Sequence, residues 1–361
     1  MKIAIIGTRG IPNNYGGFET LAEYLVKYLA NDFEITVFCS SKDLPEKLAE
    51  FNGAKLRYIP ITSHGAKGIL YDSLSLLMSV RTYDRILFLG FGGGLIIPFL
   101  RMYKHKIILN IGGLDWKRDK WSPRAKKAIK YAERYLVSYS EHIISDNIGI
   151  QDYIKSTYNR NSTLIAYGGD QAEKIEIQDA DIIAYPFLLN QYAFIVTRIQ
   201  EDNNIEMLLK AFIKQDKMPF VMVGNWNNSE YGRRIKAKYI NSKNLILLDA
   251  IYDRKKLDLL RSNCTIYVHG HSAGGTNPSL VEAMYLGLPV FAFASGYNEY
   301  TTFNKAIYFK NEVELVELIQ NYESLPLVQI GKELKELADK YYRWSFIANE
   351  YKKIFLNNEY L

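Results

Sequence analysis

The most informative stretch of the sequence runs from His269 to Met284 and reads HGHSAGGTNPSLVEAM. Apolar residues around its start predict a buried strand over Thr265–His269, and the residues after the small-residue loop predict a helix over Pro278–Gly287. The loop and the first helical turn offer backbone N–H, hydroxyl and amide groups at a helix N-terminus, where an anion is stabilised. We expect a diphosphate to bind there, against Gly275, Thr276, Asn277, Pro278 and Ser279.

Glu282 stands one turn into this predicted helix. Its carboxylate can accept hydrogen bonds from the vicinal hydroxyls of a ribose. The alternative is a structural acid that stabilises the first helical turn. The helix is expected to end at Gly287, a C′ glycine, before Pro289 opens the next strand.

Short apolar runs alternate with amphipathic stretches on both sides of this segment. In the second half, five further strands are expected over Tyr192–Thr197, Phe220–Gly224, Leu245–Leu248, Pro289–Phe293 and Ala306–Phe309. In the first half, strands are expected over Lys2–Gly7, Glu34–Cys39, Lys55–Pro60, Arg85–Gly90, Lys106–Asn110, His142–Ser145 and Thr163–Ala166. Helical patterns are expected at Ile205–Gln215, Arg254–Ser262, Val313–Tyr322 and Glu333–Tyr341, and in the first half around Leu21–Leu29 and Ala125–Leu136. This alternation predicts an α/β chain of two Rossmann-like domains with a ligand-binding cleft between them.

A polar, acidic stretch separates the two series of strands. We therefore expect an N-terminal domain over residues 1–167, a linker over 168–186 and a C-terminal domain over 187–342.

Length and composition exclude several classes of protein. The 361 residues are 48% hydrophobic with a net charge of +6, which suits two folded domains and not a disordered chain. Cys39 and Cys264 sit in or beside apolar runs, so we expect buried free thiols and no disulfide or Cys-based zinc site. No signal peptide or membrane-spanning run is recognisable, which predicts a cytoplasmic protein.

The first strand is followed by a glycine-rich turn, Gly7 to Thr20. Its spacing is not G-x-G-x-x-G, and the second strand ends without an acid for a ribose, so a dinucleotide site is not expected. The sequence also lacks a P-loop. Gly16 and Gly17, directly ahead of a helix, favour an anion-binding nest, although they could simply permit a tight turn.

These segments together resemble glycosyltransferase family 4, which has the GT-B fold. In that family a Glu, seven residues and a second Glu run into EAM-x-x-G-x-PV. Glu282-Ala283-Met284 and Gly287-x-Pro289-Val290 match the second half, whereas Gly274 stands where the first Glu would be. The variant GGTNPSLVEAM resembles the bacterial rhamnosyltransferase-like branch of polysaccharide biosynthesis. Other agreeing segments are Gly7–Glu19, Asn110–Arg118, Ser145–Ile150, Arg198 with Asn203 and Asn204, Val223–Trp226 and Tyr342–Trp344.

The resemblance implies a role for individual residues. Arg198 would contact the donor diphosphate and stabilise its departure, although it could be a surface residue at a strand end. Asn203 stands near the place where many members carry a Lys, and an amide would substitute there. Gly16 and Gly17 would let the first domain approach the donor diphosphate. The acceptor side would hold Arg9, Glu19 and Asp115; Asp115 is also a catalytic candidate, or simply a turn residue.

The resemblance also implies the reaction: retaining, metal-independent transfer of a sugar from a dTDP- or UDP-sugar. The branch resemblance favours L-rhamnose from dTDP-rhamnose. The acceptor would be a lipid-diphosphate-linked saccharide of capsule-type polysaccharide synthesis, and no cofactor is expected. The C-terminal helix, 343–361, would pack back on the first domain. Alternatives are a GT-B nucleotide-sugar epimerase or hydrolase, and a non-catalytic GT-B partner subunit.

Residues 101–130 contain ten basic and two acidic residues, with Trp116 and Trp121 among them. Basic residues interleaved with Trp can bind an anionic membrane surface or nucleic acid. No RNA-binding motif accompanies them, so we expect peripheral contact with the inner face of the membrane and no nucleic-acid partner. The alternative is a solvated basic helix face.

Overall fold

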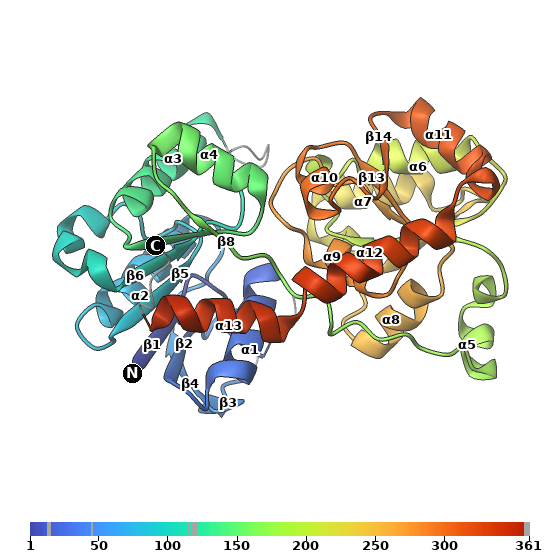
Figure 1. The fold of residues 1–361 in the computed structure, drawn as a ribbon. Helices are drawn as coiled ribbons and strands as arrows, with labels where there is room; N and C mark the ends of the chain where they lie inside the picture. The colour runs from blue at the N-terminus through green and yellow to red at the C-terminus, as the bar shows by residue number, and fades with distance from the viewer. Residues whose placement is uncertain (13–15, 45, 115, 117–121, 357–361) are drawn as a thin grey trace. The chain divides into compact units, whose positions relative to one another are not determined.

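The computed structural model describes residues 1–12, 16–44, 46–114, 116 and 122–356 (Figure 1). The chain divides into two compact units. Met1–Tyr167 and Trp344–Leu361 form the first, and Gly168–Arg343 form the second. Residues 168–186, expected as the linker, fall in the second unit.

The first unit is built on one β-sheet. Its strands are β1 (Lys2–Ile6), β2 (Glu34–Ser40), β3 (Glu50–Phe51), β4 (Ala54–Ile59), β5 (Arg85–Leu89), β6 (Ile107–Asn110), β7 (His142–Ser145) and β8 (Thr163–Leu164). They lie in the order β3-β4-β2-β1-β5-β6-β7-β8, and all neighbours are parallel except β3 and β4. Chain order reverses between β1 and β5, which makes the loops after these two strands the switch point of the sheet.

The helices of the first unit are α1 (Gly17–Leu29), α2 (Gly65–Ser79), α3 (Pro123–Ser138), α4 (Ile148–Tyr158), α13 (Trp344–Phe355) and the 3₁₀ segment η1 (Ile97–Lys106). Local chemistry sets their starts. Ser122 caps α3 by accepting a hydrogen bond from the backbone N–H of Ala125 at 3.3 Å, and Pro123 occupies the first helical position. Asn147 caps α4 through the N–H of Gly149 at 2.9 Å.

The last helix completes the core of the first unit. Figure 1 shows α13, in red, alongside the blue helix α1, and the two helices contact each other. Trp344 stacks on Tyr24 with ring centroids 4.5 Å apart. The hydroxyl of Tyr351 accepts a hydrogen bond from Asn110 at the end of β6, at 2.6 Å. Residues more than 240 positions apart in sequence therefore share one core.

The second unit is built on a parallel sheet of β9 (Ala193–Thr197), β10 (Phe220–Gly224), β11 (Leu245–Asp249), β12 (Ile266–His269), β13 (Val290–Phe293) and β14 (Ile307–Phe309). The strand order is β11-β10-β9-β12-β13-β14. Chain order reverses between β9 and β12, which pair in parallel with Tyr267 beside Phe194. The switch point of this sheet thus lies at the loops that follow β9 and β12.

Helices of the second unit pack around this sheet. They are α5 (Asp179–Ala184), α6 (Ile205–Ile213), α7 (Glu230–Tyr239), α8 (Arg254–Ser262), α9 (Pro278–Tyr285), α10 (Tyr297–Thr301), α11 (Glu312–Gln320) and α12 (Leu327–Tyr341), with the 3₁₀ segments η3 (Pro186–Leu189), η4 (Glu201–Asn203), η5 (Trp226–Asn228) and η6 (Tyr322–Ser324). All five residues of β10 are buried, as expected where helices cover both faces.

The structure confirms the expected fold class of two parallel-sheet α/β units. It adds β3 and the helices α2, α4, α5, α7 and α10, which the sequence did not predict, and shortens β8 to Thr163–Leu164. Cys39 and Cys264 are buried and free, as expected. In the part of the chain that the structure describes, no helix combines the length and apolarity needed to cross a bilayer.

Candidate functional site

The switch point of the second sheet brings two of the predicted segments together. β9 ends at Thr197 and β12 ends at His269. Because these strands are parallel neighbours, the loops that follow them lie at the same edge of the sheet. Arg198 leads one loop, and the other loop runs from Gly270 to the start of α9. Ligands of open α/β sheets bind at such a place.

Hydrogen bonds fix the two loops to each other. Both the backbone N–H and the hydroxyl of Ser272 donate to the carbonyl of Asp202, at 2.9 and 2.8 Å. The side-chain amide of Asn204 donates to the carbonyl of Gly270 at 2.9 Å. The loops therefore form one preorganised surface.

Arg198 and Asn203 take different positions in this surface. Arg198 is exposed, whereas Asn203 is only 4% exposed. The amide of Asn203 donates to the carbonyl of Arg198 at 2.7 Å and to the hydroxyl of Thr197 at 3.1 Å. Asn203 thus holds the backbone that carries Arg198, and its NH₂ group is directed at that backbone instead of at solvent.

The N-terminus of α9 is built by its own side chains. Asn277 caps the helix and accepts hydrogen bonds from the backbone N–H of Ser279 at 3.1 Å and from its hydroxyl at 2.8 Å. The sequence indicated both residues as groups for a diphosphate, but here they bond each other. Pro278 is the first helical residue and Thr276 is buried. Gly274 has φ of +127°, a conformation that L side chains rarely adopt, with open space beside it.

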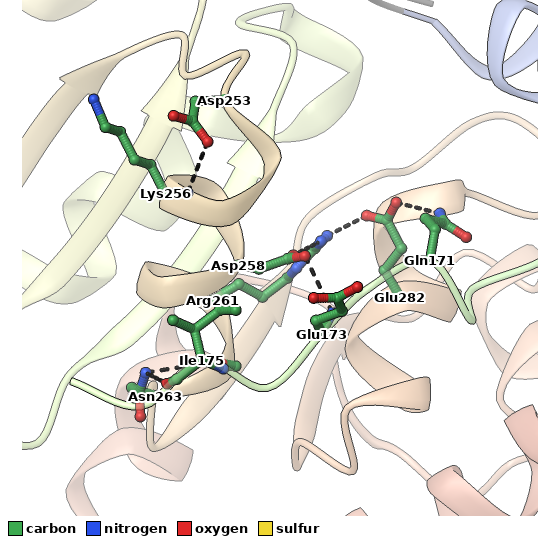
Figure 2. Close-up of polar contacts among 10 residues, drawn as sticks. Gln171, Glu173, Ile175, Asp253, Lys256, Asp258, Arg261, Asn263 and Glu282 are labelled. Atoms are coloured by element: carbon green, nitrogen blue, oxygen red, sulfur yellow. Dashed lines mark hydrogen bonds and ion pairs between the residues drawn. The ribbon is translucent and has the colours of Figure 1, made fainter. Parts of the chain in front are cut away.

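Glu282 lies in a network that the sequence analysis missed (Figure 2). One carboxylate oxygen of Glu282 bonds the Arg261 guanidinium, and the other accepts a hydrogen bond from the amide of Gln171 at 2.5 Å. Arg261, on α8, also pairs with Asp258 one turn earlier. Both residues of that pair are 1% exposed, whereas the Glu282 side chain retains 17% exposure. The carboxylate of Glu282 is thus fixed by Arg261 and Gln171, while part of the side chain remains accessible to solvent.

The network extends into the segment that follows β8. The second oxygen of Asp258 accepts the backbone N–H of Glu173 at 3.1 Å, and the N–H of Ile175 donates to the hydroxyl of Ser262 at 3.2 Å. The amide of Asn263 donates to the carbonyl of Ile175 at 2.9 Å (Figure 2). Gln171, Glu173 and Ile175 are therefore tied to the elements that carry Glu282.

Burial and charge shift the pKa values in this region. Burial alone would lower the pKa of Arg261, but the charges of Glu282 and Asp258 raise it, so the guanidinium stays protonated. Burial also raises the pKa of Asp258, against the opposing effect of Arg261. At the end of β12, burial lowers the pKa of His269 to about 3, so this imidazole is neutral at pH 7.

In the first unit, the predicted glycine turn lies at the β1–β5 switch point. Gly16 caps α1 with φ of +121°, and a Cβ there would meet the carboxylate of Glu19 at 2.0 Å. Gly17 is the first residue of the helix. Glu19 folds back on the turn and accepts hydrogen bonds from the hydroxyl of Thr8 at 3.1 Å and the backbone N–H of Arg9 at 2.9 Å. Its carboxylate thereby fixes the turn.

Arg9 is half-buried in this turn, and its Nε has no hydrogen-bond partner among the described residues. A buried guanidinium nitrogen that lacks an acceptor suits an anionic ligand. Asp115, expected on the acceptor side, lies outside the described residues, as do Trp121 and the basic residues Lys117, Arg118 and Lys120. In the described part of the chain, no three His, Cys, Asp or Glu side chains gather as a metal site would require.

The structure thus places the predicted residues in two groups. Arg198, Asn203 and the residues from Gly275 to Glu282 lie in the second unit, and Arg9, Gly16, Gly17 and Glu19 in the first. The sequence analysis missed Arg261 and Asp258. One pattern could have indicated them: an acid and a base stand three residues apart, on either side of the apolar pair Leu259-Leu260.

Two family descriptions match the chain. Residues 1–170 match a domain of unknown function, DUF1972, and residues 189–341 match glycosyl transferases group 1. A comparison with curated proteins gives no match.

Solved structures share the fold across nearly the whole chain. Sucrose-phosphate synthase from Thermosynechococcus elongatus is similar with a TM-score of 0.83 and 17% identity, over 99% of this chain and 98% of that chain. HepE from Anabaena, solved with UDP and glucose, has a TM-score of 0.77 and 14% identity, over 99% and 100%. A glycosyltransferase from Rickettsia africae has a TM-score of 0.71 and 12% identity, over 99% and 98%. The expectation of the GT-B fold is confirmed.

Proposed function

We propose that this GT-B chain, whose residues 189–341 form a glycosyl transferases group 1 domain, is a retaining glycosyltransferase that needs no metal ion. Its donor is a nucleoside-diphosphate sugar. Its acceptor is a saccharide carried on a lipid diphosphate, as in capsule and related polysaccharide synthesis. Among donors we favour dTDP-L-rhamnose, because Gly274 stands where a Glu would contact the hydroxyls of the usual hexose.

The observation that carries the proposal is the convergence of three groups at the β9–β12 switch point and its flanking helix. Arg198 is an exposed cation at the strand end, and the N-terminus of α9 favours negative charge. Glu282, one turn further, presents a carboxylate fixed by Arg261. Cation, helix N-terminus and carboxylate match a diphosphate followed by a ribose. Stabilising the leaving diphosphate in this way accelerates glycosyl transfer.

The acceptor belongs to the first unit in this proposal. The turn after β1 offers Arg9 with its unpartnered Nε, and Glu19 as the carboxylate that orders the turn. The basic residues of the segment 101–130 would keep the protein at the inner face of the membrane, where a lipid-linked acceptor is held. A sedimentation assay with anionic liposomes tests this part. Equal binding by the wild type and by Lys126/Lys127/Lys130→Glu would exclude it.

A donor screen tests the central claim. Thermal-shift measurements with dTDP-rhamnose and UDP-glucose should show stabilisation by a nucleotide sugar, and product analysis with lipid-linked saccharides should show transfer. Arg198→Gln should abolish the shift. Its matched control is Arg234→Gln, another arginine of the second unit, and it should keep the shift. Transfer from UDP-glucose with no response to dTDP-rhamnose would refute the rhamnose assignment while leaving the glycosyltransferase.

Two alternatives predict other outcomes. A nucleotide-sugar epimerase or hydrolase would consume the donor without acceptor as fast as with it. A non-catalytic partner subunit would neither bind nor consume a donor. The ordered Arg198 loop and the fixed Glu282 favour an active donor site over the second alternative.

A further inference from the structure

A second site lies in the first unit, whereas the proposed donor residues belong to the second. A pocket of about 650 Å³ is lined by residues of α3 and α4. These two helices contact each other and lie side by side in Figure 1. Its lining includes Lys127, Lys130, Tyr131 and Arg134 from α3, and Thr157 and Tyr158 from the end of α4.

The pocket concentrates positive charge. Lys127, Lys130 and Arg134 follow each other at spacings of three and four residues, so they are neighbours on one face of α3. None of the lining residues is an acid. In the described part of the chain, no carboxylate forms an ion pair with any of the three cations. Like charges at this spacing destabilise a helix, and an anion between them removes the repulsion.

The only acid of α3, Glu133, is not among the residues that line the pocket. Glu133 is fully buried, and its carboxylate accepts hydrogen bonds from the hydroxyls of Tyr153 and Tyr158 at 2.5 Å each. The one carboxylate of α3 is therefore buried and bonded to two tyrosine hydroxyls, whereas the three cations line the pocket.

Contacts also hold the pocket walls in place. The hydrogen bond to Glu133 fixes the Tyr158 ring. The guanidinium of Arg160 donates to the carbonyls of Val137 and Ser140, both at 2.9 Å, and joins the ends of the two helices. Nζ of Lys130 lies 4.0 Å from the centre of the Trp116 ring, a cation–π contact that orients the ammonium. The ammonium of Lys130 is therefore oriented before a ligand binds, which reduces the entropic cost of binding.

We propose that this pocket binds a phosphate or diphosphate group. Three cations of one pocket suit a ligand with two or more negative charges. Arg134 can pair with two oxygens at once, the two lysines act as point charges, and the hydroxyl of Thr157 adds a neutral donor. The phosphate is either the head group of a lipid or part of a soluble molecule. The inference deepens the lipid-linked acceptor of the proposed function, but its test involves no sugar transfer, so either can fail alone.

Binding measurements on matched variants test the pocket. The pocket variant is Lys127→Gln/Arg134→Gln, and the control is Lys47→Gln/Arg81→Gln, which removes the same two charges from exposed positions elsewhere in the first unit. Both are built on Arg198→Gln, so that the proposed donor site does not contribute. The probes are inorganic pyrophosphate, by calorimetry, and phosphatidylcholine vesicles with or without phosphatidic acid, by sedimentation.

We expect the pocket variant to bind at least one probe about tenfold or more weakly than the control, because each lost cation removes a charge-assisted hydrogen bond. Weakened binding to phosphatidic acid vesicles, with no binding to phosphatidylcholine alone, identifies a lipid head group. Weakened binding to pyrophosphate only identifies a soluble phosphate. If the two variants bind both probes equally, the proposal is wrong. Equal melting temperatures confirm that both variants are folded.

Discussion

Arg261→Met tests the buried network around Glu282. The change removes the guanidinium that lies between Asp258 and Glu282 and leaves two carboxylates without their counter-charge. Removing one partner of a buried ion pair costs about 3–5 kcal/mol. In a domain of 150–250 residues, each kcal/mol lowers Tm by about 2–4 °C, so the transition of the second unit should fall by roughly 6–20 °C.

The control is Arg343→Met. Arg343 pairs with Asp339 at 2.8 Å, but the two side chains are 50% and 34% exposed. Such a surface pair contributes about 0–1 kcal/mol. Urea unfolding, followed by the fluorescence of Trp226, which is buried in the second unit, measures both variants. If Arg261→Met costs no more than Arg343→Met, the network does not stabilise the fold.

The pH dependence gives a second check on the same variant. Without Arg261, the pKa of buried Asp258 rises further above its unfolded value, because the attraction that opposed burial is gone. A raised folded pKa means that the native state holds more protons than the unfolded state, so stability falls as pH rises. The deficit of Arg261→Met relative to the wild type should therefore be larger at pH 8 than at pH 5. A deficit that is constant with pH would contradict this reasoning.

Three further predictions concern other parts of the chain. Burial lowers the pKa of His269 to about 3, so below pH 6.5 the unfolded state binds more protons than the native state and stability falls as pH drops. His269→Phe should remove about 2 kcal/mol of the stability that the wild type loses between pH 7 and pH 5, as measured by urea unfolding at both pH values. Trp344→Ala removes a fully buried ring from the first unit and should cost about 3–5 kcal/mol, and calorimetry should show that unit's transition move alone. Glu282→Gln should raise KM for the donor about tenfold or more, because a charged acceptor for the ribose hydroxyls is lost, whereas Glu323→Gln at an exposed position of the same unit should leave KM unchanged.

Apolar runs predicted the sheets because strands buried on both faces leave a direct signal. α2 shows why the apolar pattern did not predict every helix. Ser73, Ser75 and Ser79 lie on its buried face, where apolar side chains would normally mark the helix. The hydroxyls of Ser75 and Ser79 donate to backbone carbonyls four residues earlier, which satisfies them without any partner from another element. A search for apolar residues at helical spacing therefore does not identify α2.

The site shows the same limit at longer range. The loop before α9 and the position of Glu282 follow from local chemistry, so the sequence predicted them as a unit. Gln171 and Arg261 lie 111 and 21 residues from Glu282, and nothing in the sequence indicates that their side chains meet its carboxylate. Likewise, Asn277 and Ser279 look like two free ligands in sequence, but the geometry of the helix cap makes each the partner of the other.

The packing of α13 has a consequence for the order in which the chain folds during synthesis. Residues 1–167 leave the ribosome first, yet the side chains of Trp344, Tyr351 and Phe355, which are fully buried in their unit, are made only after the whole second unit. Until then α1 exposes the surface that Trp344 covers, including Tyr24. The second unit is continuous in sequence and can close as soon as it is complete. The unit that is synthesised first is therefore the last to be completed.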